Sequence, residues 1–185
     1  MLKLFAKLVF KIIGFKIEGN YPLEQKKMII AVVPHTSNWD FPLGILTKWY
    51  LGANINFIGK SSLFKKPYGW FFRYLGGTPI DRSKSQNTVR AVANAFEREE
   101  RLTIAIAPEG TRSKVDRLKG GFYYIAKLAE IPILLVKFDF QNRLVGFSEL
   151  FYPSENEEKD WEFLNNYWNG IHGKIPEKSF GYTAP

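Results

Sequence analysis

A histidine and an aspartate five positions apart are the first residues in this sequence that could do chemistry. The chain has 2 histidines, and one of them, His35, directly follows an apolar run and precedes Asp40. Within one continuous helix, residues five apart point about 140° away from each other. The pair can meet if a helix begins near Trp39, with Ser37 or Asn38 as its N-cap. Asp40 then lies in the first turn, and its carboxylate can reach back to the imidazole.

Such a pair predicts a general base. The carboxylate would hold one ring nitrogen of His35 and leave the other to take a proton from an alcohol. The alternative is an Asp40 that only caps the helix beside an incidental histidine. The chain has 0 cysteines and no Gly-x-Ser-x-Gly segment, so a covalent acyl-enzyme is not expected. His172 is expected in a distant helix, and no metal site is therefore predicted.

A second polar group directly follows the apolar run of residues 102–107. It consists of Glu109, Gly110, Thr111 and Arg112. The glycine permits close backbone approach, the threonine offers a hydroxyl, and the arginine can bind a phosphate through two parallel hydrogen bonds. Arg82, after the extended stretch 78–80, is a further candidate. The alternatives are an ordinary turn with a solvated Arg112, and an Arg82 that is simply neutralised by Asp81.

The charge of the chain indicates an anionic partner. The formal net charge is +8; residues 1–119 carry 20 basic and 9 acidic side chains, whereas residues 120–185 carry 6 and 9. Phosphate groups or an acidic membrane surface would match the basic part. The basic residues follow no recognition-helix or RNA-binding pattern, so no nucleic-acid partner is expected.

The first fourteen residues predict an amphipathic helix at a membrane interface. Lys3, Lys7 and Lys11 fall within an arc of about 80°, and apolar side chains fill most of the remaining circumference. Such a helix lies in the interface rather than crossing the bilayer. The alternative is a terminal helix docked on its own domain. We expect residues 1–14 to be this membrane-binding helix and residues 15–185 to be one folded domain.

The remaining pattern predicts an α/β fold. Strands are expected at 15–18, 28–33, 55–58, 78–80, 102–107, 133–138 and 143–147. Helices are expected at 39–51, 67–75, 85–100, 121–130 and 156–172. The central strands are apolar throughout, which is typical of a sheet covered on both faces. We therefore expect a single domain with a mixed, mostly parallel sheet flanked by helices, and functional loops at the carboxyl ends of its strands.

Four segments, in their order along the chain, resemble the motifs of the glycerolipid acyltransferase family, whose founding activity acylates lysophosphatidic acid. The family's His-x4-Asp box matches residues 35–40, and its Glu-Gly-Thr-Arg block matches residues 109–112. Its glycine-to-Asp-Arg block matches residues 76–82, and its apolar, proline-containing block resembles residues 131–134. The resemblance implies that His35 is the general base, that Asp40 is its partner, and that Arg82 and Arg112 bind the acceptor's phosphate.

The resemblance also implies a reaction and a location. A fatty acyl group would move from acyl-CoA or acyl carrier protein to a hydroxyl of a lysophospholipid or glycerol-phosphate-type acceptor, with no cofactor besides that thioester co-substrate. Glu109 is expected to support its loop or to bind a substrate hydroxyl. The expected partners are an anionic membrane surface, the thioester donor and a phosphate-bearing lipid, and the expected place is the cytoplasmic face of the cell membrane, as a peripheral protein. A thioester hydrolase and a non-catalytic lipid-binding or membrane-tethering protein remain alternatives.

Overall fold

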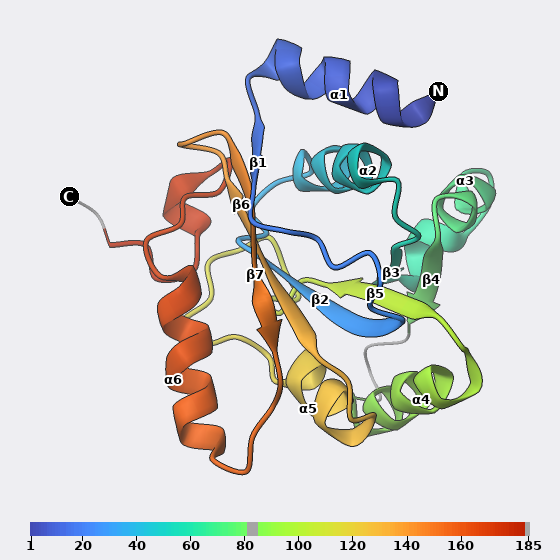
Figure 1. Ribbon diagram of the computed structural model, residues 1–185, viewed down its shortest axis with the longest axis vertical. Helices are drawn as coiled ribbons and strands as arrows, with labels where there is room; N and C mark the ends of the chain where they lie inside the picture. The colour runs from blue at the N-terminus through green and yellow to red at the C-terminus, as the bar shows by residue number, and fades with distance from the viewer. Residues whose placement is uncertain (81–84, 184–185) are drawn as a thin grey trace.

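One mixed sheet forms the centre of the molecule (Figure 1). The computed structural model describes residues 1–80 and 85–183, and within them seven strands form a sheet of order β1-β7-β6-β2-β5-β3-β4. The strands are β1 (Lys16–Glu18), β2 (Lys27–Val33), β3 (Asn56–Lys60), β4 (Gly77–Ile80), β5 (Leu102–Ile106), β6 (Ile133–Asp139) and β7 (Leu144–Phe151). Neighbouring strands are parallel, except that β6 and β7 are antiparallel.

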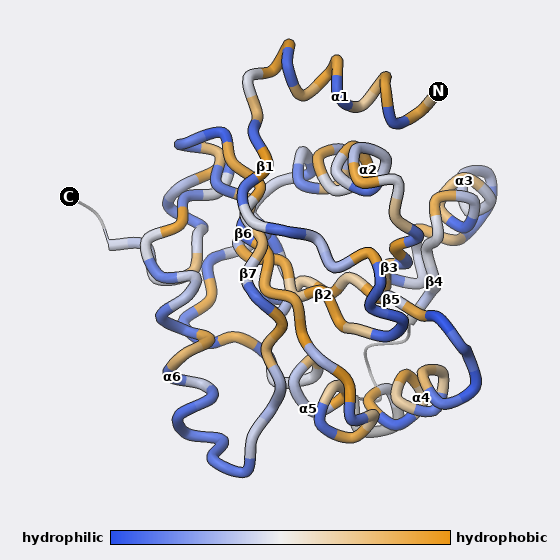
Figure 2. The backbone as a smooth tube through the Cα atoms, in the orientation of Figure 1, coloured by the Kyte–Doolittle hydropathy of each residue, from blue (hydrophilic) through white to orange (hydrophobic). Residues whose placement is uncertain are grey.

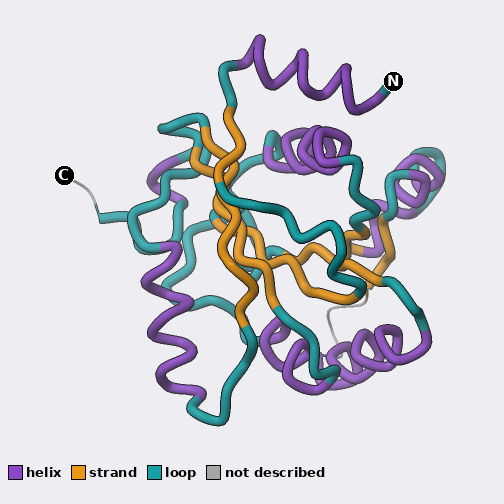
Figure 3. Tube along the Cα trace, viewed as in Figure 1, coloured by secondary structure: helices purple, strands orange, loops and turns teal. Residues whose placement is uncertain are grey.

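Helices cover both faces of this sheet (Figures 1 and 3). The α-helices are α1 (Leu2–Ile13), α2 (Asp40–Leu51), α3 (Gly69–Tyr74), α4 (Ser85–Arg98), α5 (Gly121–Leu128) and α6 (Glu157–Trp168). Two short 3-10 turns are η1 (Ser61–Phe64) and η2 (Pro176–Lys178). The predicted single α/β domain with a mostly parallel sheet flanked by helices is confirmed.

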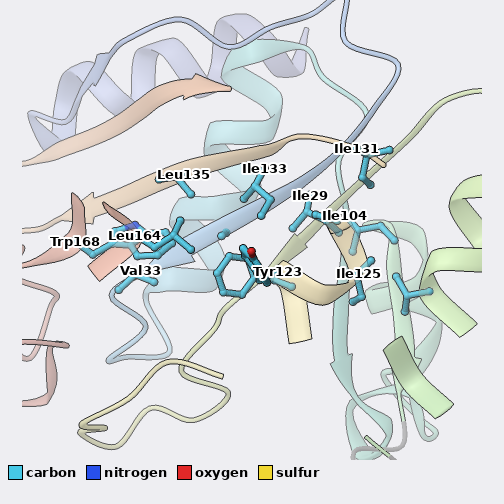
Figure 4. Close-up of a cluster of buried hydrophobic side chains, with 14 of the residues drawn as sticks. Ile29, Val33, Ile104, Tyr123, Ile125, Ile131, Ile133, Leu135, Leu164 and Trp168 are labelled. Carbon is cyan, nitrogen blue, oxygen red and sulfur yellow. The ribbon is translucent and has the colours of Figure 1, made fainter. Parts of the chain in front are cut away.

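The central strand β2 shows why the sheet needs two helical layers. Successive side chains of a strand point to opposite faces. Ile29 and Val33 pack in the cluster formed with α4, α5 and α6, which Figure 4 shows around Tyr123. Met28 and Ile30 pack on the other face, in a cluster formed with α1 and α2. A continuous apolar run is therefore buried on both sides, as expected for a central parallel strand.

Helix α1 is docked along one face only. Ala6 and Phe10 are buried, and the Phe10 ring lies 5.0 Å from that of Tyr50 on α2. The wider apolar arc stays exposed and includes Leu4 and Leu8, at 74% and 58% exposure. Figure 2 shows orange apolar and blue polar positions alternating along this helix. In the described part of the chain, no helix has the length and hydropathy needed to cross a bilayer.

One predicted helix boundary is wrong, and the two 3-10 turns η1 and η2 were not predicted. α6 ends at Trp168, because Asn169 is extended and Gly170 adopts a positive φ of 74° that terminates the helix. His172 therefore lies in the segment after α6 and not within a helix. The turn η1 lies in a stretch for which the sequence predicted no element.

Candidate active site

The carboxyl ends of two neighbouring parallel strands bring the two polar groups together. Ala31 of β2 lies opposite Ile106 of β5 in the sheet register. The chain continues in the same direction from both strands, so the loops that follow emerge side by side at one edge of the sheet. The backbone N–H of His35 donates a hydrogen bond to Oε2 of Glu109 across this junction. The histidine loop and the Glu109–Arg112 loop thus form one site.

The predicted contact between His35 and Asp40 is present. Nδ1 of His35 lies 3.0 Å from Oδ2 of Asp40, and the same oxygen accepts a hydrogen bond of 2.8 Å from the backbone N–H of Ser37. Because a carboxylate only accepts hydrogen bonds, we assign the ring proton to Nδ1 and the lone pair to Nε2. The His35 side chain is 25% exposed and that of Asp40 is 3% exposed. The imidazole is open to solvent while its partner is shielded, which suits a general base.

The start of α2 differs from the predicted cap. Trp39 is the N-cap residue, and no side chain of Ser37 or Asn38 caps the helix. Asp40 is instead the first helical residue, and its carboxylate folds back over the preceding turn. A negative charge at a helix N-terminus is stabilised by the helix dipole. The backbone N–H of Ser37 thus holds the carboxylate of Asp40 toward His35.

Glu109 lies beneath the site instead of at its surface. Its side chain is 1% exposed, and Oε1, like Oδ1 of Asp40, is buried with no hydrogen-bond partner among the described residues. Burial raises the pKa of Glu109 from 4.5 to about 7; the negative Asp40 adds to the rise, whereas the backbone N–H groups of His35 and Phe180 oppose it. The Glu109 carboxyl is thus shielded from solvent, and its role, support of the loop or a contact with a substrate hydroxyl, stays a prediction.

The loop after β5 presents its cation to solvent. Gly110 has a φ of 65°, a conformation that glycine adopts without strain. The Thr111 hydroxyl accepts a hydrogen bond of 3.2 Å from the backbone N–H of Ser113, so part of its capacity is used locally. The Arg112 side chain is exposed. The loop therefore runs from the end of β5 to the surface, where Arg112 is exposed after Gly110 and Thr111.

A second cation lies against this loop that the sequence did not reveal. The backbone N–H of Lys119 donates a hydrogen bond of 2.9 Å to the carbonyl of Pro108, which brings residue 119 back to the start of the loop. A Cβ atom built on Gly110 would lie 2.8 Å from Nζ of Lys119. The ammonium group of Lys119 therefore lies directly against the backbone of Gly110. The signal in the sequence was weak, because Lys119 is one of several basic residues between 112 and 119.

The segment of residues 172–182 closes the far side of the site. The backbone N–H of Ile175 donates a hydrogen bond of 3.2 Å to the hydroxyl of Thr36, a buried neighbour of His35. Nζ of Lys114 donates a hydrogen bond of 3.0 Å to the carbonyl of Tyr182. Both site loops are thus fixed by a segment that sequence patterns describe only as a loop.

The remaining residues named from the sequence are Arg82, a predicted phosphate-binding residue, and His172, which was expected away from the site. Arg82 lies outside the described residues. His172 contacts Oε1 of Gln141 through Nδ1. In the part of the chain that is described, no three or more His, Asp or Glu side chains gather in a way that could hold a metal ion.

Comparison with known proteins identifies the family. A family model described as Acyltransferase matches residues 14–138, which include β2, the His35–Asp40 pair and the Glu109–Arg112 loop. The chain belongs to the acyltransferase family. The predicted kinship with the glycerolipid acyltransferases is therefore confirmed.

Two acyltransferases illustrate the relationship. A 1-acyl-sn-glycerol-3-phosphate acyltransferase of Streptococcus pneumoniae is 32% identical over 125 residues, which is 66% of this chain. The aligned part spans about half of that relative, 46% of its length. The crystal structure of the 1-acyl-sn-glycerophosphate (LPA) acyltransferase PlsC from Thermotoga maritima has the same fold. Its TM-score is 0.59 at 22% identity, covering 90% of this chain and 74% of that one.

Proposed function

We propose that this acyltransferase transfers a fatty acyl group from a thioester donor, acyl-CoA or acyl carrier protein, to the free hydroxyl of 1-acylglycerol-3-phosphate. The observation that carries the proposal is the 3.0 Å contact between Nδ1 of His35 and Oδ2 of Asp40, beside a loop that offers exposed cations. The names of the related proteins support the choice of acceptor. Nothing in the site distinguishes the two donors, so both are tested.

In the proposed reaction, Nε2 of His35 takes the proton of the acceptor hydroxyl as the oxygen attacks the thioester carbonyl carbon. The carbon–sulfur bond then breaks, an ester is formed, and the thiolate leaves with the proton returned by His35. Asp40 keeps the imidazole in the required tautomer and stabilises the imidazolium that forms transiently. Arg112 and Lys119 bind the acceptor's phosphate, and Arg82 is a further candidate for this role. Their contribution is to position the hydroxyl against the base.

The exposed face of α1 supports the proposed location, peripheral on the cytoplasmic face of the cell membrane. Leu4, Leu8 and Ile12 are exposed at 74%, 58% and 73%, and the helix also carries three exposed lysines. An apolar face bordered by lysines binds an anionic bilayer through both burial and charge. Removal of residues 1–14 is expected to weaken sedimentation with anionic vesicles, although α1 also packs on α2 and its loss exposes that face.

The test is a thiol-release assay with the full chain, combined with mass spectrometry of the lipid product. Acyl-CoA and an acyl carrier protein thioester are each supplied with 1-acylglycerol-3-phosphate, with monoacylglycerol as the matched acceptor without a phosphate, or with no acceptor. We expect release that depends on the acceptor and is highest with the phosphate-bearing lipid, together with a diacylated product. Release without an acceptor would make the protein a hydrolase, and no release with any acceptor would make it a lipid-binding protein.

A further inference from the structure

We propose that the segment from the end of β3 through α3, residues 60–74, is a second membrane-binding surface that inserts aromatic side chains into an anionic bilayer. We call residues 60–74 the aromatic segment. The inference extends the membrane association proposed for α1 and rests on it in part. It goes further because this surface is separate from α1 in sequence and is built differently.

The aromatic segment exposes apolar side chains that its own domain does not cover. Five of its large hydrophobic residues are exposed at between 40% and 78%. They are Leu63 at 40%, Tyr68 at 70%, Trp70 at 69%, Phe71 at 43% and Tyr74 at 78%. Tryptophan and tyrosine are the residues enriched where a bilayer meets water, because each combines an apolar ring with a polar group. The composition of this surface therefore matches the interfacial region of a membrane.

The segment is held in shape from beneath, so the exposure is not that of a loose loop. Phe64 is buried, and its carbonyl accepts a hydrogen bond of 3.1 Å from Nη1 of Arg73. Gly69 packs so closely on that carbonyl that a Cβ would lie 2.1 Å from the oxygen. Phe64 and Phe72 form an edge-to-face ring pair at 6.2 Å. One set of aromatic rings anchors the segment, and the other set is presented outward.

The distribution of charge favours an anionic bilayer as the binding partner of this surface. Residues 1–17 and 41–80 contain 9 basic and 0 acidic residues, whereas the rest of the chain contains 17 basic and 18 acidic residues. All of the net positive charge thus comes from the stretches that contain α1 and the aromatic segment. Lys60, Lys65 and Lys66 are exposed beside the aromatic side chains. Stretches that carry only basic charges are attracted to a surface of acidic lipids, which favours a bilayer over a protein partner.

The two membrane-binding elements flank the helix that carries Asp40. α1 contacts α2 through the ring pair of Phe5 and Trp49 at 6.4 Å. The aromatic segment contacts the start of α2 through the ring pair of Phe72 and Phe41 at 5.6 Å. Figure 1 shows α1 and α3 around α2. Because Phe41 follows Asp40 directly, the aromatic segment would bring the bilayer surface close to the proposed catalytic pair.

The chain has 0 cysteines, which permits a direct test by single-site labelling. Tyr74→Cys, Tyr152→Cys and Leu8→Cys are each labelled with an environment-sensitive fluorophore in the full chain. Tyr152 is the matched control, since it is an exposed tyrosine at 60% outside the aromatic segment and α1. With vesicles of phosphatidylglycerol and phosphatidylcholine, we expect blue-shifted, stronger emission at positions 74 and 8 and no change at 152. The same response must be lost with pure phosphatidylcholine or in high salt.

Substitutions in the unlabelled protein give a second measurement. Tyr74→Ser should weaken vesicle binding by about three- to tenfold, because less apolar surface is removed from water. Lys66→Gln should weaken it by about fivefold, the effect of one cation near an anionic surface. The matched changes Tyr152→Ser and Lys159→Gln, both at exposed positions, should leave binding unchanged. Thermal unfolding of each variant checks that the fold is retained.

The outcomes separate this inference from the proposed function. A response at position 8 without one at position 74 overturns membrane binding by the aromatic segment and leaves α1 as the membrane anchor. A response at position 74 that requires only a higher protein concentration, without vesicles, overturns it in favour of a second copy of the chain. No response at either position overturns membrane binding by both elements. Acyl transfer to a dispersed acceptor is measured separately and does not depend on any of these results.

Discussion

The buried carboxyl of Glu109 leads to a prediction about stability that needs no substrate. Its folded-state pKa of about 7 exceeds the ordinary 4.5, so the folded protein retains a proton that the unfolded chain releases. Between these two values the folded state binds more protons at Glu109, so the contribution of this group to stability falls as the pH rises. A difference of 2.5 pKa units corresponds to about 3 kcal/mol, of which about 2–3 kcal/mol is lost between pH 5 and pH 8.

The substitution Glu109→Gln should remove this pH dependence. Glutamine keeps the size of the side chain and an oxygen for the N–H of His35, but it does not titrate. Urea unfolding of the wild type and the variant at several pH values between 5 and 8 gives the two free energies of unfolding. We expect the free energy of unfolding of the variant, relative to that of the wild type, to increase by about 2–3 kcal/mol from pH 5 to pH 8. Titrations common to both proteins cancel in the difference.

A matched control is Glu155→Gln, which changes an exposed glutamate. Its pH profile should run parallel to that of the wild type. If the difference in stability between the wild type and Glu109→Gln is the same at pH 5 and pH 8, then Glu109 is already ionised at pH 5. The account of a carboxyl kept neutral by burial would then be wrong.

The remaining predictions concern the proposed reaction. His35→Ala should lower kcat by about two to four orders of magnitude in the thiol-release assay while the thermal unfolding temperature changes little; near-native turnover would exclude a general base at this position. Asp40→Asn should lower kcat more than it raises the acceptor's KM, and a loss confined to thermal stability would reduce Asp40 to a structural role. Arg112→Ala should raise the acceptor's KM by about tenfold to a hundredfold, because a charge-assisted bond contributes about 1.5–3 kcal/mol, and Arg112→Lys should restore only part of it. A rise in the donor's KM instead would assign Arg112 to a phosphate of the donor. Lys119→Gln should raise the same acceptor constant by about tenfold, and an unchanged value would make Lys119 only a neighbour of the loop.

The framework of the sheet was predictable because its strands carry strong local signals. β2, β5 and β6 are apolar runs, and their order along the chain with intervening helices indicated a parallel sheet before the structure was known. The pairing of His35 with Asp40 was predictable for a similar reason. Both residues belong to one strand–loop–helix connection, and six consecutive residues contain all the information needed to place them.

The features that the sequence did not reveal depend on contacts between distant segments. Lys119 reaches Gly110 because its backbone bonds to Pro108, and no periodic pattern describes such a turn. The pKa of Glu109 depends on its burial and on the backbone N–H groups of His35 and Phe180, both distant from it in the sequence. The predicted helix cap was wrong because the N-cap residue is Trp39; the Ser37 hydroxyl bonds to the N–H of Trp39, and the Asp40 carboxylate bonds back to the N–H of Ser37. Helix-capping propensities consider each residue type alone and do not include the contact between Asp40 and His35.

The hydrogen bond between Ile175 and Thr36 has a consequence for the folding of the chain during its synthesis. These residues are separated by 139 positions, and the loop of His35 leaves the ribosome long before its partner does. Such a contact cannot close before the intervening chain has been synthesised, and long-range contacts of this kind slow folding. The nascent chain can therefore present α1 and the aromatic segment to a bilayer while the loops around His35 still lack their final support. If α1 and the aromatic segment bind a bilayer as proposed, this attachment can form before the loops around His35 are fixed.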